Sequence, residues 1–215
     1  MHMCFSATAS FAAAAITGAI GFVTLRRARS AAERPFAAMP LLFAVQQAAE
    51  GGLWLALVHP DPGIWPWAFT QVFLAFALVI WPVYAPAAVF MVEPDPRRRN
   101  IMFAQGLLGV ATASFFLVQL LTLRNEGYIS GHHILYRTDV DAPLTAGLIY
   151  LSSTVLAMLV SSHRMIVMLG AVIFVGAVAS WLFMEEAFVS VWCFFAAAAS
   201  VIILAHGQLP VRHSA

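Results

Sequence analysis

Seven long apolar stretches, separated by short breaks that hold most of the charged residues, constrain this chain more than any other feature. An α-helix needs about 20 mostly apolar residues to cross the roughly 30 Å hydrocarbon layer of a membrane, and each stretch reaches about that length. The predicted spans are residues 5–25, 36–58, 65–92, 101–123, 142–161, 165–184 and 187–206. The sequence therefore predicts an all-α, polytopic membrane protein, a bundle of seven transmembrane helices that forms a single domain over residues 1–215.

The composition excludes the other broad classes of protein. Of the 215 residues, 62% are hydrophobic and 10% are charged, whereas soluble domains have about 25% charged residues. So few charges cannot cover a water-exposed surface, which excludes a soluble globule, a disordered region and a secreted disulfide scaffold. The net charge of +1 gives no reason to expect a nucleic-acid partner, so the expected partner is the lipid bilayer.

The basic residues predict how the chain is oriented. The chain contains no lysine, and with seven spans nine of its eleven arginines fall on one side of the membrane and only Arg124 and Arg137 on the other. Because basic loops stay in the cytoplasm, we expect the N-terminus outside, the C-terminus in the cytoplasm and the chain in the inner (plasma) membrane. The first apolar run is expected to be an anchor, since its basic residues follow it, unlike those of a signal peptide.

Glu50 is the one acidic residue that lies well inside a predicted span. It lies about eight residues, or roughly 12 Å, below the outer end of the second span. Gln46 or Gln47, Glu50 and Trp54 recur at steps of three and four residues and so share one helix face. We expect this face to point into the bundle, because lipid cannot satisfy an amide or a carboxyl.

An ionisable group inside a membrane is by default a hypothesis for a functional site. No Arg or His lies in the middle of a predicted span, so the sequence offers Glu50 no obvious positive partner. Three interpretations remain open: a neutral carboxyl that hydrogen-bonds between helices, a proton-carrying site, or a carboxylate that binds a metal ion or an amine.

The two cysteines lie on rows of small residues in the first and last spans. Such rows allow another helix to approach closely, so Cys4 and Cys193 are predicted to face inward. Both fall in the outer half of the bundle, as do Glu50 and Glu186. The pair His132 and His133 lies above them in the external loop 124–141.

Thiolate, imidazole and carboxylate groups are ligands of zinc, copper and iron. The candidate metal ligands are therefore Cys4, Glu50, Cys193, His132 and His133. The candidate ligand-binding residues are Gln46, Gln47, Glu50, Trp54, Glu186 and Trp192. No local metal-binding spacing supports the metal interpretation, and a disulfide, a redox pair or two unrelated buried thiols are alternatives.

Four functions follow from these residues. The expected one is a membrane protein whose external-side polar pocket around Glu50 binds a metal ion or a small ligand. The alternatives are a proton-coupled transporter, a membrane-embedded thiol- or metal-dependent enzyme, and a purely structural bundle.

Three segments carry a family resemblance. They are Met-Cys-Phe-Ser-Ala at Met3–Ala7, Gln-Gln-x-x-Glu-Gly at Gln46–Gly51 and Ser-Val-Trp-Cys-Phe-Phe at Ser190–Phe195. In these segments, and over most of its length, the chain resembles a bacterial family of uncharacterised integral membrane proteins, a domain of unknown function. The resemblance implies that these residues act as a set and that Met3 is the native start, and it supplies no reaction.

Overall fold

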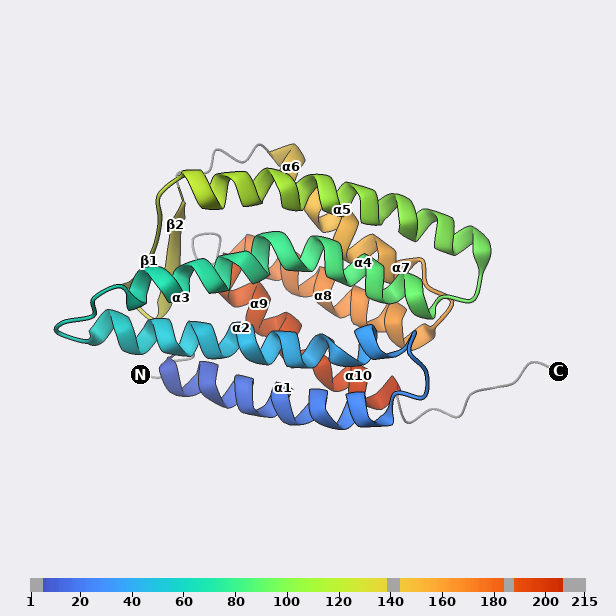
Figure 1. Ribbon diagram of the computed structural model, residues 1–215, viewed down its shortest axis with the longest axis horizontal. Helices are drawn as coiled ribbons and strands as arrows, with labels where there is room; N and C mark the ends of the chain where they lie inside the picture. The colour runs from blue at the N-terminus through green and yellow to red at the C-terminus, as the bar shows by residue number, and fades with distance from the viewer. Residues whose placement is uncertain (1–5, 139–143, 184–187, 207–215) are drawn as a thin grey trace.

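The computed structural model describes residues 6–138, 144–183 and 188–206. Their helices lie side by side along one long axis, with a small β-hairpin at one end (Figure 1). The elements are α1 (Ala7–Arg27), α2 (Arg34–Val58), α3 (Trp65–Leu74), the π-helix η1 (Ala75–Ile80), α4 (Trp81–Val92), α5 (Pro96–Thr122), β1 (Asn125–Ser130), β2 (His133–Thr138), α6 (Leu144–Leu151), the π-helix η2 (Ser152–Leu156), α7 (Ala157–Leu159), α8 (Arg164–Phe183), α9 (Phe188–Ala198) and α10 (Ser200–His206).

Five helical segments are long and apolar enough to cross a membrane. They are Ala7–Arg27, Arg34–Val58, Trp65–Val92, Pro96–Thr122 and Arg164–Phe183. The predicted fifth and seventh spans correspond to two shorter apolar helices, Thr145–Leu159 and Val191–Ala205. The helical architecture is therefore confirmed, while five of the seven predicted spans reach membrane-crossing length within the described ranges.

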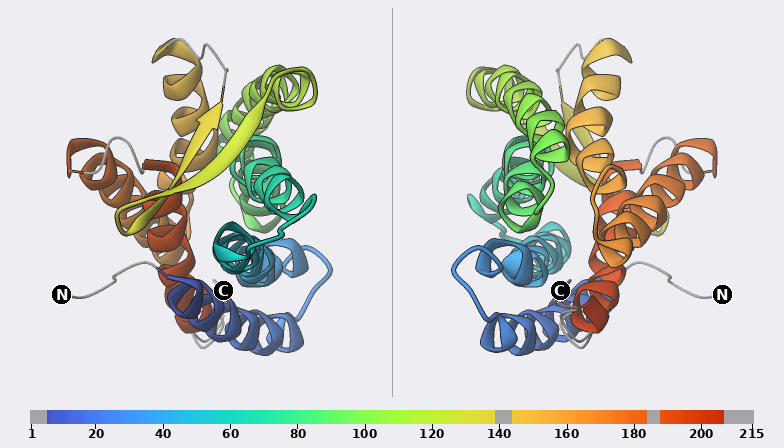
Figure 2. Two further views of the ribbon diagram at one scale, coloured as in Figure 1. Left: turned by 90° about the vertical axis from the view of Figure 1, so that its left-hand side faces the viewer. Right: turned by 90° about the vertical axis from the view of Figure 1, so that its right-hand side faces the viewer.

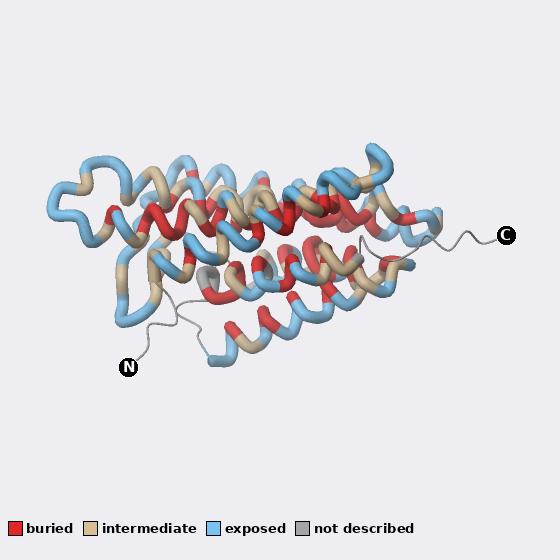
Figure 3. The backbone as a smooth tube through the Cα atoms, turned by 90° about the horizontal axis from the view of Figure 1, so that it is seen from below, coloured by how far each residue is buried: buried red, intermediate tan, exposed pale blue. Residues whose placement is uncertain are grey.

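Buried residues follow the inward faces of the helices and exposed residues the outward faces (Figure 3). Many of the exposed side chains are large and apolar; Val175 of α8, for example, is 64% exposed and Leu121 of α5 is 74% exposed. An apolar outer surface of this kind is stable in contact with lipid, whereas its contact with water would be unfavourable.

The two ends of the bundle differ in charge. The connections α1–α2, α4–α5 and α7–α8 meet at one end, which we call the arginine end, and the hairpin and the α2–α3 connection lie at the other, which we call the hairpin end (Figure 1). The arginine end holds Arg26, Arg27, Arg29, Arg34, Arg97, Arg98, Arg99 and Arg164, and the hairpin end holds Arg124 and Arg137. The folded chain thus keeps the charge asymmetry seen in the sequence.

The hairpin corrects one sequence prediction, since the structure forms two strands within residues 124–141, where the sequence predicts a loop. Strands β1 and β2 pair antiparallel from Asn125↔Thr138 to Ser130↔His133, with Gly131 at φ +59 in the turn. Each strand holds β-branched and aromatic residues, which favour strands, and the glycine between the strands allows a tight turn. The hairpin crosses the end of the bundle (Figure 2, left) and contacts α2, α3 and α9, and its Ile134 is only 1% exposed.

A proline explains the π-helical turn inside the third span. The Trp81 N–H donates to the carbonyl of Phe76, five residues earlier, instead of to Ala77. The next residue, Pro82, has no N–H to donate, so the Ala77 carbonyl needs another donor. The Tyr150 hydroxyl of α6 supplies it, at 2.5 Å. The defect in one helix is thus satisfied by a side chain from another.

A second proline explains a close contact between α4 and α5. The Pro82 carbonyl cannot receive the usual helical hydrogen bond, because Pro86 stands four residues later. Gly109 of α5 packs directly on this carbonyl: a Cβ atom at Gly109 would lie 1.8 Å from the Pro82 oxygen. A glycine is therefore required for the two helices to approach this closely.

We expect Gly109→Ala to destabilise the protein by about 2 kcal/mol or more, because backbone has to move to relieve the clash. Gly106→Ala, three residues earlier on α5, is the matched control, since a Cβ there meets nothing within 4 Å. That control should be neutral or stabilising by up to about 1 kcal/mol from helix propensity alone. Unfolding in mixed detergent micelles measures both, and equal effects of the two substitutions would contradict the contact.

Candidate functional site

The Glu50 side chain lies in the interior, where three segments meet. Glu50 is 1% exposed and belongs to α2. The Ser10 hydroxyl of α1 lies 3.5 Å from its Oε2 atom, and the Tyr136 hydroxyl of β2 lies 3.4 Å from its Oε1 atom. Both hydroxyls donate to the carboxyl. The carboxyl therefore connects α1, α2 and the hairpin.

Tyr136 is held so that its hydroxyl reaches Glu50. Its ring stacks on Phe73 of α3, with ring centroids 4.6 Å apart and planes inclined by 1°. The residue as a whole is partly exposed, but its hydroxyl lies against the buried carboxyl. Burial of this hydroxyl, and then the charge of Glu50, raise the pKa of Tyr136 well above its ordinary value. Tyr136 therefore remains a hydrogen-bond donor over the physiological pH range.

One turn before Glu50, Gln46 joins two further groups to the site. It is fully buried, and its Oε1 atom accepts from the Trp81 indole N–H at 2.7 Å. Because an indole nitrogen can only donate, the oxygen of the amide must face Trp81. The NH₂ group then faces α9 and donates to the Cys193 sulfur at 3.1 Å.

The Cys193 thiol completes the cluster. It is 6% exposed and belongs to the same packed cluster as Phe73 and Tyr136. We call Ser10, Gln46, Glu50, Tyr136 and Cys193 the Glu50 site. The structure thus brings together three residues singled out from the sequence, Gln46, Glu50 and Cys193, with two that the sequence did not indicate.

The other candidate ligand-binding residues have different surroundings. Gln47 is fully buried, and neither atom of its amide has a hydrogen-bond partner among the described residues. Trp54 is half-buried on α2. Trp192 donates its indole N–H to the Ile173 carbonyl at 3.2 Å. Glu186 lies outside the described residues.

The predicted metal cluster does not form within the described residues: no three His, Cys, Asp or Glu side chains among them gather at distances that could hold a metal ion. His132 and His133 lie at the tip of the hairpin, where His133 pairs with Ser130. The strand that leads inward from this tip brings Tyr136, not an imidazole, to Glu50. Burial, and then the charge of His132, lower the pKa of His133. Cys4 lies outside the described residues.

A second buried carboxyl, Glu93, lies at the arginine end. It is 3% exposed and accepts hydrogen bonds from the Ser161 hydroxyl at 3.0 Å, from the Ser162 N–H at 2.8 Å and from the Ser162 hydroxyl. Arg98 donates to the Ser161 carbonyl at 2.9 Å. The connections α4–α5 and α7–α8 are thus fastened together. In the sequence Glu93 stands in a polar break, where nothing distinguishes it from a solvated residue.

The Glu93 contacts predict an acid-sensitive element of stability. Burial raises the pKa of Glu93, but hydrogen bonds from Ser162, Asp95 and Ser161 outweigh it and lower the pKa below its ordinary value. A lowered folded-state pKa means that the stabilisation is present above the unfolded-state pKa and is lost as pH falls through the folded-state value.

At pH 7 we therefore expect Glu93→Gln to be less stable than the wild type by about 1–3 kcal/mol. The difference should shrink as the pH is lowered from about 5 through the acid range, because protonation weakens the same contacts in the wild type. Thermal unfolding against pH measures this, with Asp61→Asn, an exposed carboxylate removed, as control. A difference that is constant with pH would contradict the prediction.

The fold and the site define a helical protein with five helices able to span a membrane and a buried carboxyl beside hydroxyl, amide and thiol groups. The chain belongs to a family of unknown function, DUF6629, whose model matches residues 3–214. Comparison with curated proteins and with solved structures finds no match.

Proposed function

We propose that the protein is a seven-span protein of the bacterial plasma membrane, with its N-terminus outside and its C-terminus in the cytoplasm. The charge difference between the two ends supports this orientation, because arginine-rich connections stay on the cytoplasmic side. The two shorter apolar helices, Thr145–Leu159 and Val191–Ala205, would complete the bundle with the five longer ones. The hairpin end then faces outward, and the Glu50 site lies in the outer half.

In this protein the Glu50 site binds a small ligand that carries a positive charge or hydrogen-bond donors. The observation that carries this proposal is the Glu50 carboxyl itself, 1% exposed and in contact with hydroxyls from α1 and the hairpin. Burying a carboxyl in an apolar bundle costs several kcal/mol. A hydrocarbon side chain at this position would avoid that cost, so the carboxyl has a use that packing alone does not supply.

Two neighbouring features favour a small cationic ligand over a metal ion. Glu50 and Cys193 are two metal-ligating groups, and zinc, copper or iron would need further ligands. A small amine needs only the carboxylate, neighbouring hydrogen-bond acceptors and an aromatic face, and the stacked rings of Phe73 and Tyr136 lie beside Glu50. The amide of Gln47, one turn away and without a partner among the described residues, adds a further polar group.

The alternatives use the same residues in other ways. A proton-coupled transporter would protonate Glu50 in one step of its cycle, with Tyr136 as its neighbour toward the outside. A thiol- or metal-dependent enzyme would use Cys193 as nucleophile or ligand. The hydrogen bond from Gln46 to the sulfur is compatible with either role, and the binding proposal is the simplest that accounts for the carboxyl.

The test compares the thermal stability of the purified wild type and Glu50→Gln in the presence of methylammonium and, separately, of Zn²⁺. A ligand at 100 times its Kd stabilises the folded state by about 2.7 kcal/mol, so the wild type should show a higher Tm with methylammonium, and Glu50→Gln should not. Glu126→Gln removes an exposed carboxylate from β1 and should respond as the wild type does. No response in the wild type to either probe, or the same response in Glu50→Gln, would exclude the proposal.

A further inference from the structure

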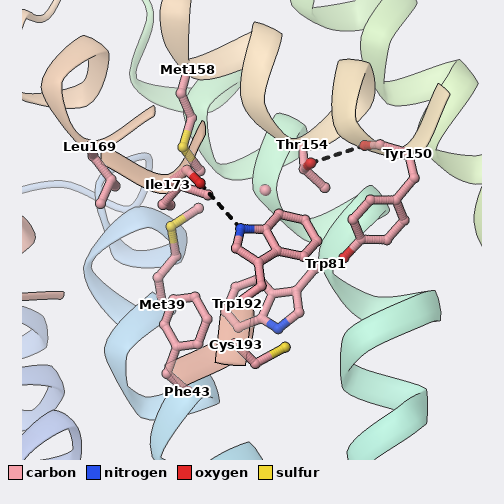
Figure 4. Close-up of a pocket in the computed structure, with 11 residues that line it drawn as sticks. Met39, Phe43, Trp81, Tyr150, Thr154, Met158, Leu169, Ile173, Trp192 and Cys193 are labelled. Carbon is pink, nitrogen blue, oxygen red and sulfur yellow. Dashed lines mark hydrogen bonds between the residues drawn. The ribbon is translucent and has the colours of Figure 1, made fainter. Parts of the chain in front are cut away.

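A cavity beside the Glu50 site has a different chemical character from that site. It has a free volume of about 40 Å³ and lies between α2, α4, the α6–η2–α7 segment, α8 and α9. The aromatic rings of Phe43, Trp81, Tyr150 and Trp192 form much of its wall (Figure 4). Cys193 also lines it, so the cavity adjoins the Glu50 site through one shared residue.

The polar groups of the cavity wall already have partners within the protein. The Trp81 indole donates to Gln46, and the Trp192 indole donates to the Ile173 carbonyl. The Tyr150 hydroxyl donates to the Ala77 carbonyl, and the Thr154 hydroxyl donates to the Tyr150 carbonyl. A water molecule needs two to four polar partners to be stable in a cavity, and this wall offers it almost none.

The remaining wall side chains are apolar and adaptable. Met39 of α2 and Met158 of α7 face the cavity (Figure 4), and a methionine fits itself to irregular apolar shapes more readily than a branched side chain does. Thr154 belongs to η2, and single π-helical turns occur frequently at functional sites. A cavity that excludes water and has flexible apolar walls favours an apolar occupant.

We propose that this cavity is a binding site for a hydrocarbon group, either the chain of a membrane lipid or a free apolar molecule. The two sources share the same chemistry, a saturated or unsaturated chain without polar atoms in the buried part. The proposal does not depend on ligand binding at Glu50, since none of the residues that line the cavity carries a charge.

Photo-crosslinking of the whole protein in lipid nanodiscs tests the proposal with two probes. One is a phosphatidylcholine that carries a diazirine on its acyl chain, and the other is a free alkyl diazirine. Peptide mass spectrometry then locates the adducts. We expect adducts on Met39 or Met158, in addition to adducts on lipid-facing residues such as Val175, which is 64% exposed. Adducts from the first probe alone identify a lipid chain, and adducts from the second alone identify a free molecule.

The variant Ala85→Phe fills the cavity, because Ala85 is buried in its wall. It should lower the cavity adducts at least fivefold and leave those on Val175 unchanged. Ala87→Phe, on the exposed side of the same helix, is the matched control and should label like the wild type. Equal cavity labelling in Ala85→Phe and in the wild type, or labelling of Val175 without any cavity adduct from either probe, would overturn the proposal.

A second variant covers the case in which Ala85→Phe does not fold. Met158→Ala enlarges the cavity, so it should give more cavity adducts than the wild type, whereas general damage to the fold would give fewer. Cavity labelling of Met158→Ala at or below the wild-type level, in protein that elutes as a folded species, would also overturn the proposal.

Discussion

A carboxyl group in an apolar helix bundle has to be surrounded by polar groups, and in this protein those groups come from distant parts of the chain. The Glu50 carboxyl in α2 accepts hydrogen bonds from the hydroxyls of Ser10 in α1 and of Tyr136 in the hairpin. One turn earlier, Gln46 connects the same helix to Trp81 and Cys193. The polar side of α2 therefore fixes the positions of α1, α4, α9 and the hairpin relative to one another. Non-directional apolar packing would leave these positions less sharply defined.

The same requirement applies to the backbone. Pro82 and Pro86 remove two donors from the third span, and another helix packs at each of the carbonyls that lose their usual donor. Tyr150 donates to the Ala77 carbonyl, and Gly109 allows α5 to lie directly on the Pro82 carbonyl. The π-helical turn, the close approach of α5 and the position of Tyr150 in the cavity wall are consequences of these prolines. Tyr150 connects the two features, because it donates to the carbonyl left free by Pro82 and also lines the apolar cavity.

The sequence predicts the features that follow from composition and helical periodicity. Long apolar stretches predict the helices, and the steps from Gln46 to Glu50 predict a shared buried face, because both depend only on local spacing. Tyr136 and Ser10 could not be predicted as neighbours of Glu50, since their contacts join residues 86 and 40 positions away in the chain. Glu93 could not be distinguished from a solvated acid either, because its partners Ser161 and Ser162 lie on another connection. The apolar cavity could not be predicted either, because it depends on how the side chains of α2, α4, the α6–η2–α7 segment, α8 and α9 pack together in three dimensions.

The central claim is that the Glu50 carboxyl in α2 accepts a hydrogen bond from the Tyr136 hydroxyl of the hairpin. A double-mutant cycle of Glu50→Leu and Tyr136→Phe tests it most directly, with the free energy of unfolding of the four proteins measured in mixed detergent micelles. The account predicts that the two substitutions are coupled by about 1 kcal/mol, since each removes the same contact. Effects that add to within about 0.3 kcal/mol would show that the two groups do not interact.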